Sequence, residues 1–299
     1  MASHTIPAAG ARVSLDGDPL AVHNMDLLQP AKLAPRPYLH PVRSLAGTVA
    51  TQSEPADHRH HLGLSIAFPD VNGTNFWGGS TYTPASGPVL LDNHGVQRAH
   101  GWQSTPDAEF GGVSWFSQSG RQLAAEQRRI EYLYHPEPAS WSLSLFSVIV
   151  PAAGVQRLEV SSSAVKGRKG AGYGGIFWRF PEATAQPLVI SSAGSGADAA
   201  HGSVSPWLSV SMVVNKAPVT VLLAQEPDRL LPWFIRAEGY LGAGPAVAWT
   251  QAAIADHNNP LKLALHAVVH DGPVSTPAQA LELLQQHPFT SHSSPDRTS

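Results

Sequence analysis

The sequence predicts an all-β protein: a large β-sandwich, with a mutarotase-like supersandwich as one possible form, and one C-terminal helix. Its apolar runs are short, and Gly and Pro, at 26 residues each, interrupt them along the whole chain. Many runs alternate at period two. In WSLSLFSVIV, for example, Trp141 and Leu143 face one way, whereas Ser142 and Ser144 face the other. This pattern is typical of strands that cover a core with one face.

The chain has 299 residues, of which 42% are hydrophobic. That is enough for one large core, so we expect a single domain over 1–299 with its core at about 12–288. Strands are expected, in chain order, at 12–17, 38–47, 62–68, 94–103, 111–118, 121–135, 141–152, 158–165, 174–180, 207–214, 219–225, 234–242, 246–255 and 261–272.

The segment STPAQALELLQQH predicts the helix, with Thr276 as N-cap and Pro277 in its first turn. The polar tail at 290–299 has the composition of a disordered segment.

Composition argues against several function classes. The net charge is −3 and charged residues make up 14% of the chain, so no basic field is available for nucleic acid. The chain lacks cysteine, which removes thiolate chemistry. No apolar run approaches the length of a membrane span, and the N-terminus lacks the pattern of a secretory signal. We therefore expect a cytoplasmic protein that acts on a small molecule.

The segment DHRHH places Asp57, His58, His60 and His61 just before the apolar run LGLSIAF. If 60–68 is a strand, His60 shares a face with core residues, and His61 shares the other face with small ones. His58 and His60 would then lie about 6.7 Å apart and point the same way. They could converge on one ion or one substrate oxygen, with Asp57 orienting a ring. We take these four residues as catalytic candidates; the alternative is an exposed polar loop.

A second polar run supports a functional interpretation. On a strand over 94–103, one face carries His94, Arg98, His100 and Trp102. Such a face suits either a ligand or plain solvent, and the sequence leaves both open. With His58 and His60, His94 and His100 could complete the shell of a divalent cation of unknown identity. The glycine-rich segment GRKGAGYGG reads as a loop, and no phosphate loop, dinucleotide fingerprint or nucleophile elbow is present.

Four segments resemble the PmoA-like family of unknown function. They are DHRHH (57–61), DVNGTNFW (70–77), GIFWR (175–179) and WFIRAEG (233–239), within a likeness that runs from about 36 to 285. Arg59 replaces the usual proline, and Pro69 stands where the family often has glycine. The family name suggests a subunit of a membrane methane oxygenase, but this chain has no spanning segment. The resemblance instead implies a β-sandwich protein of bacterial carbohydrate catabolism, often found with a sugar oxidoreductase.

These observations favour a carbohydrate-active enzyme that cleaves a glycoside, for example a 3-keto-glycoside, by acid/base or metal-assisted β-elimination or hydrolysis. The alternatives are an aldose mutarotase or epimerase, and a non-catalytic sugar-binding module. Candidate substrate-binding residues are Arg43, Trp77, Arg98, Arg179 and Arg236. For Arg43, Arg179 and Arg236, a buried salt bridge is an equally good interpretation.

Overall fold

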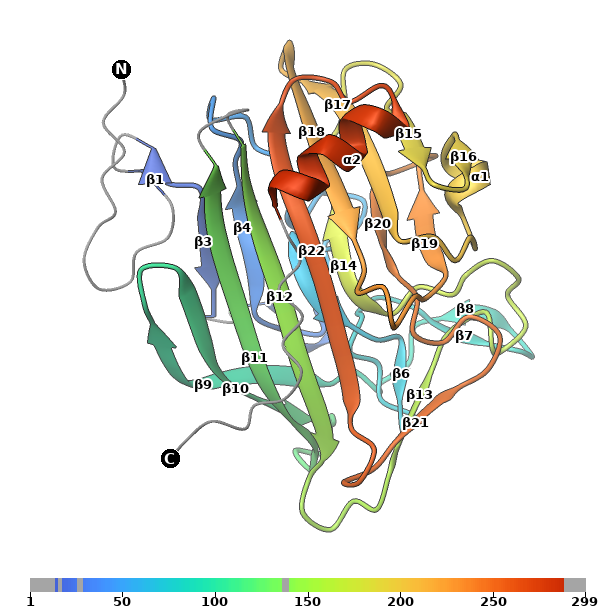
Figure 1. The fold of residues 1–299 in the computed structure, drawn as a ribbon. Coiled ribbons are helices and arrows are strands. Elements are labelled where there is room, and N and C mark those ends of the chain that lie inside the picture. Colours follow the sequence, from blue (N-terminus) through green and yellow to red (C-terminus); the bar gives the residue numbers. More distant parts are fainter. Residues whose placement is uncertain (1–13, 16–17, 26–28, 136–139, 288–299) are drawn as a thin grey trace.

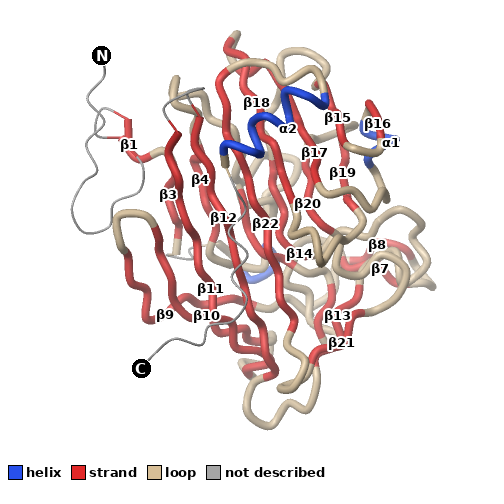
Figure 2. Tube along the Cα trace, viewed as in Figure 1, coloured by secondary structure: helices blue, strands red, loops and turns tan. Residues whose placement is uncertain are grey.

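The computed structural model describes residues 14–15, 18–25, 29–135 and 140–287. Two antiparallel sheets face each other across the main core (Figures 1 and 2). In spatial order the larger sheet contains β16 (Gly194–Ser195), β15 (Leu188–Ser191), β17 (Trp207–Val214), β18 (Ala217–Ala224), β22 (Leu261–Asp271), β12 (Ser140–Pro151), β11 (Gln122–His135), β10 (Ala108–Phe116) and β9 (Val96–Ser104).

The opposing sheet has six strands. In order they are β19 (Trp233–Arg236), β20 (Gly242–Pro245), β14 (Gly175–Arg179), β5 (Leu64–Ala67), β4 (Tyr38–Val42) and β3 (Ala21–Asn24). A small sheet of β21 (Ala253–Ala255), β13 (Leu158–Ser161) and β6 (Asp70–Val71) lies at one end. The remaining strands form two short pairs, β1 (Ser14–Leu15) with β2 (Asp18–Pro19), and β7 (Thr81–Thr83) with β8 (Gly87–Val89). The predicted all-β sandwich is thus confirmed.

Both main sheets obey the two-residue alternation that the sequence shows. Leu64 and Ile66 of β5 enter the core between the sheets, as do Val221 and Leu223 of β18. On β18 the intervening Leu222 faces outward and joins a second apolar cluster. Alternation therefore leaves each sheet an outer face whose side chains are free to pack against a helix or to line a pocket.

Helix α2 (Pro277–Gln286) occupies the outer face of the nine-stranded sheet (Figure 1). Thr276 caps it as predicted: its side chain accepts from the Gln279 amide, and Gln279 bonds back in a capping box. Ala280 and Leu283 pack on the sheet, and His287 just beyond bonds Ser140 and Ser142. Two shorter helical segments, η1 (Ala31–Leu33) and α1 (Ala197–Ala200), also occur.

The predicted strand at 62–68 shortens to Leu64–Ala67, and the strand at 234–242 ends at Arg236. Strand β20, with sequence GAGP, carries no pattern by which sequence could predict it. It forms because it pairs with β14 on one side and β19 on the other. Glycine allows the close approach to β14, since a side chain at Gly244 would come within 2.0 Å of the Ile176 carbonyl oxygen. The predicted disordered tail lies outside the described residues.

Two ion pairs on β11, one buried and one partly exposed, allow the effect of burial on the free energy of unfolding to be compared. Arg128 Nε lies 2.6 Å from Glu126, with both side chains buried, whereas Arg129 lies 2.6 Å from Glu131 with its side chain 47% exposed. We expect Arg128→Gln to lower the free energy of unfolding by roughly 3 kcal/mol or more, because it leaves the buried carboxylate of Glu126 without a positive partner. Arg129→Gln should cost less than about 1 kcal/mol. Denaturant unfolding checks this, and equal losses would contradict the assignment.

Candidate functional site

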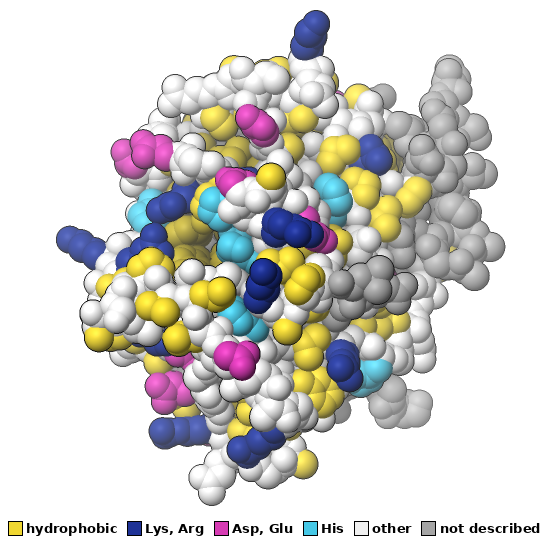
Figure 3. All heavy atoms as spheres, turned by 180° about the vertical axis from the view of Figure 1, so that it is seen from behind, with side chains coloured by type: hydrophobic (Ala, Val, Ile, Leu, Met, Phe, Trp, Pro, Cys, Tyr) yellow, Lys and Arg dark blue, Asp and Glu magenta, His cyan; other side chains and the backbone are white. Residues whose placement is uncertain are grey.

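A pocket of about 1020 Å³ opens on the outer face of the six-stranded sheet. Its base is an apolar cluster that includes Trp77, Phe177 and Phe234, with Tyr173 and Tyr240 packed against it. In the space-filling view of this face, histidines gather near Lys and Arg side chains with apolar surface between them (Figure 3). The site is therefore an aromatic floor with charged and imidazole walls.

The same alternation that fills the core supplies this floor. Where Ile176 and Trp178 of β14 point into the core, Phe177 and Arg179 point to the other face. Ser65, between two core residues of β5, likewise faces the site side. The face of β5 for which the sequence predicts small residues therefore lies on the same side of the sheet as the pocket.

The histidines do not extend β5, as the sequence suggested, but lie in two turns before it. The His58 amide donates to the Pro55 carbonyl and the His61 amide donates to the His58 carbonyl. The turns bring three rings together: His58 stacks on His61 at 4.8 Å between ring centres, and His60 lies 4.6 Å from His61. An alternating strand would have pointed His60 and His61 to opposite faces.

Two glycines make room for this cluster. Gly78 and Gly79 have φ of +95° and +69°, a region that favours glycine. A side chain at Gly78 would come within 2.6 Å of His60 Cβ, and one at Gly79 within 2.9 Å of the His60 ring. The close approach of the two loops therefore requires both glycines.

Arg36 supports the cluster from the side of the sheet, and no motif or pattern in the sequence singles it out. The side chain is 1% exposed and donates to the carbonyls of His60, Trp77 and Ala34 and to the Ser65 hydroxyl. A single planar guanidinium thus joins the histidine turns, the Trp77 loop and β5.

Burial sets the protonation states of the site. Desolvation lowers the pKa of His60 to about 4, and it lowers the pKa of His61 well below the usual range. Both rings are therefore neutral at pH 7. Desolvation also raises the pKa of Tyr240 to about 12, which keeps the phenol protonated.

His58 differs because it has a carboxylate partner. Its Nδ1 lies 2.8 Å from Asp57 Oδ2, and this hydrogen bond lowers the pKa of Asp57. An ionised carboxylate only accepts, so Nδ1 donates the proton of this bond, and the neutral form of the ring has its lone pair on Nε2. His58 lines the pocket beside Tyr240, with 5.0 Å between ring centres.

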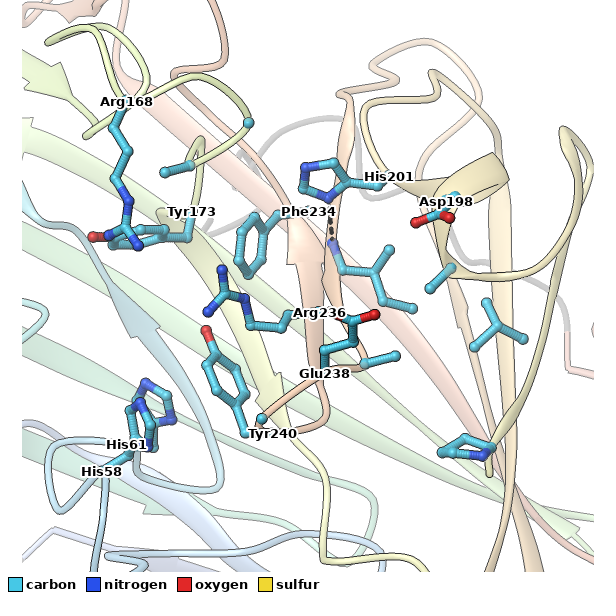
Figure 4. A pocket seen from close by; sticks show the side chains of 18 of the residues that line it. His58, His61, Arg168, Tyr173, Asp198, His201, Phe234, Arg236, Glu238 and Tyr240 are labelled. Carbon is cyan, nitrogen blue, oxygen red and sulfur yellow. Dashed lines mark hydrogen bonds between the residues drawn. The ribbon is translucent and has the colours of Figure 1, made fainter. Parts of the chain in front are cut away.

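The other walls come from segments far away in sequence (Figure 4). Arg168, Lys169 and Tyr173 belong to the glycine-rich loop before β14, a segment whose sequence predicts only a connection. Asp198 and His201 come from α1 and the residue after it. Phe234 and Arg236 lie on β19, and Tyr240 follows in the next loop.

The predicted catalytic residues Asp57, His58, His60 and His61 all line this pocket. Of the predicted substrate-binding residues, Trp77 and Arg236 also line it. Arg179 lies just behind, its guanidinium carbon 5.0 Å from the Tyr240 ring centre. The catalytic and substrate-binding roles of these residues stay predictions.

Arg43 and Arg98 are not among the residues that line the pocket. The guanidinium of Arg43 reaches the Gly47 carbonyl at 3.5 Å. Arg98 lies on the edge strand β9, exposed, with its guanidinium over the Phe116 ring. The exposed position of Arg98 fits the solvent-facing alternative for this strand. The buried salt bridge considered for the other arginines is not found: within the described residues, no ion pair involves Arg43, Arg179 or Arg236.

His94 and His100 also do not line the pocket. His94 is buried, and its Nε2 bonds the Gly79 carbonyl at 2.7 Å, behind the loop that contacts His60. His100 is exposed on β9 and its ring lies against Gly112. The prediction of a single polar face on this strand is wrong. Opposite Phe110 and Gly112, β9 has one extra residue between Gln103 and His100, and this bulge turns Trp102 against the core.

The described part of the chain contains no cluster of three or more His, Asp or Glu residues arranged to hold a metal ion. The proposed set of His58, His60, His94 and His100 is not brought together around one point. A divalent cation at this protein stays a prediction.

The fold and the site together define a β-sandwich protein with a histidine-lined pocket on the outer face of one sheet. A family model described as a family of unknown function (DUF6807) matches residues 10–285, so the chain belongs to that family. The match agrees with the prediction that the chain belongs to a family of unknown function, but it does not support the PmoA-like name. No curated protein matches the chain. Among the described residues, no helix has the length and apolar character needed to cross a membrane.

We expect Arg36→Met to loosen the site more than the fold. Three buried carbonyls lose their donor, at about 1–3 kcal/mol for each acceptor left unsatisfied. Amide hydrogen exchange at His58, His61 and Gly79 should accelerate at least about tenfold, while exchange in β12 changes much less. Arg36→Lys should not restore protection, because an ammonium cannot span the same acceptors. Unchanged exchange at these amides would contradict the role of Arg36.

Stability should depend on pH through the buried imidazoles. Among the described residues, burial lowers the pKa of His40, His60, His61, His266 and His287. Below about pH 6.5 the unfolded chain binds protons that the folded chain does not, so stability is full above that pH and falls as pH drops toward 4. His60→Gln should reduce the loss between pH 7 and pH 5 by on the order of 1 kcal/mol. An unchanged slope of unfolding midpoint against pH would contradict this.

Proposed function

We propose that this protein is a carbohydrate-active enzyme that cleaves a glycoside by acid/base chemistry, with β-elimination as the leading reaction. The observation that carries the proposal is the hydrogen-bonded pair of Asp57 and His58 in the wall of a pocket with an aromatic floor. The ring centre of His58 lies 5.0 Å from that of Tyr240, whose phenol is protonated. A base and an acid thus face one space that is large enough for a sugar.

His58 is the proposed general base. Asp57 fixes the tautomer with Nε2 free and stabilises the imidazolium that forms when Nε2 takes a proton. His60 and His61 are too weakly basic for this task, because burial keeps their rings neutral far below pH 7. Neutral imidazoles beside the base are suited to hydrogen-bond a substrate oxygen.

Tyr240 is the proposed general acid. Its phenol is protonated at neutral pH, and the guanidinium carbons of Arg179 and Arg236 lie 5.0 and 5.5 Å from its ring centre. These cations stabilise the phenolate that remains after proton donation. In a keto-glycoside, His58 would remove the proton next to the carbonyl. The C–H electron pair would form a C=C bond, and the β-oxygen would leave with the Tyr240 proton.

The aromatic floor supports a sugar as substrate. Trp77, Tyr173, Phe234 and Tyr240 present rings to the pocket, and such rings pack against the apolar face of a pyranose while polar walls reach its hydroxyls. On this proposal a cytoplasmic sugar oxidoreductase supplies the keto-glycoside.

We expect His58→Ala and Asp57→Asn to lower kcat by about 100-fold and 10-fold or more, with smaller changes in substrate binding. His257→Ala is the matched control, because His257 is exposed in a turn outside the pocket. Assays use a panel of glycosides and 3-keto-glycosides, before and after chelation, because a divalent cation at His58 and His60 could also polarise a substrate oxygen.

The outcomes separate the alternatives. Anomer interconversion without bond cleavage would identify a mutarotase or epimerase instead. Sugar binding that persists in His58→Ala, with no turnover in the wild type, would identify a binding module and contradict the enzyme.

A further inference from the structure

Five cations surround the pocket without a carboxylate partner. Arg168, Lys169 and Arg236 line its walls, whereas Arg36 and Arg179 lie buried just behind His60 and Tyr240. Within the described residues, no ion pair involves any of these five side chains. The pocket is therefore bordered by positive charges that take no part in an ion pair, although the more distant carboxylates of Asp57 and Glu182 act on Arg179.

The two buried cations are the most informative. Arg36 donates only to carbonyls and a hydroxyl, and desolvation lowers its pKa to about 9. Arg179 is 5% exposed and donates to the carbonyls of Phe180 and Leu241, while its Nε has no partner among the described residues. Uncompensated charge inside a protein is costly, so an anion in the pocket would recover part of that cost.

The carboxylates in the pocket do not fill this need. Asp57 is bound to His58, and Asp198 lies at α1 near His201, separated from His58 and His61 by Arg236 and Tyr240 in the close-up (Figure 4). Glu238 follows Arg236 in an exposed loop and makes no ion pair with it. Three cations and three carboxylates line the pocket, and one of these carboxylates, Asp57, already has a partner. The buried Arg36 and Arg179 add two positive charges, against which, among the described residues, only Glu182 adds a further negative charge near Arg179.

We propose that the substrate is an acidic sugar, with a uronate-type carboxylate that binds between Arg236 and Tyr240 on the side of Arg179. The catalytic part of this inference rests on the proposed function. The shape of the site supports it: both guanidinium groups flank the Tyr240 ring, and the ring of His58 lies beside the same tyrosine.

An acidic sugar also supplies the chemistry without a prior oxidation. Once its charge is neutralised by arginine, a carboxylate acidifies the hydrogen on its own α-carbon. His58 takes that proton, and the C–H electron pair moves toward the carboxylate. It then forms a C=C bond as the β-oxygen leaves with the proton from Tyr240. The products are an unsaturated uronate and a free hydroxyl on the released sugar.

Binding of matched sugar pairs tests this directly. Glucuronate and galacturonate, with their short oligomers, are compared with glucose, galactose and the neutral oligomers by calorimetry. We expect the acidic sugars to bind at least about tenfold more tightly, with a preference that weakens as salt rises. Arg236→Gln should remove most of that preference, and Arg121→Gln, an exposed arginine outside the pocket, should leave it intact. Equal affinity for both members of each pair, or an unchanged preference in Arg236→Gln, would overturn the inference.

Turnover separates this inference from the proposed function. The unsaturated uronate is followed by the ultraviolet absorbance of its conjugated C=C bond, in the wild type and in His58→Ala. Arginine-dependent binding of uronates without turnover of any sugar would support the acidic ligand and contradict the enzyme. Turnover of neutral keto-glycosides that requires His58, with no preference for acidic sugars, would support the enzyme and overturn the acidic substrate.

Discussion

The site depends on one buried guanidinium. Arg36 reaches carbonyls in the histidine turns and the Trp77 loop, and also the Ser65 hydroxyl on β5, so three segments are fixed to one planar group. Turns have no ladder of backbone hydrogen bonds to hold them, and the donors of Arg36 take its place. The burial that makes these bonds strong also leaves a positive charge under the pocket, so the support and the electrostatics of the site have one origin.

The six-stranded sheet serves the core and the pocket at the same time. Along β14, Ile176 and Trp178 fill the sandwich, while Phe177 and Arg179 face the site. A site on such a face inherits the rigidity of the core beneath it, because every second side chain of the same strand is locked in packing. Loops supply the imidazoles and the rim cations, and the sheet supplies the floor against which they are positioned.

The fold class and the helix followed from local patterns. Period-two alternation predicted most strands of both main sheets but missed the short strands β3, β15, β16 and β20. Thr276 with Pro277 predicted the start of α2, since capping involves only neighbouring residues. The pattern failed where a neighbour decides the conformation. Strand β20 has no apolar pattern and exists because β14 and β19 flank it, and the bulge in β9 became visible only against β10.

By itself the sequence determined that this chain is a β-sandwich and that Asp57, His58, His60 and His61 form one cluster, since residues so close along the chain stay close in any fold. It did not determine what faces that cluster. Tyr240, Arg236 and the 168–173 loop reach the pocket through sheet pairing and loop packing, and Arg36 is placed by contacts with three distant segments. Burial and the nearness of charges from distant segments set the protonation states of the site, and both are properties of the tertiary structure.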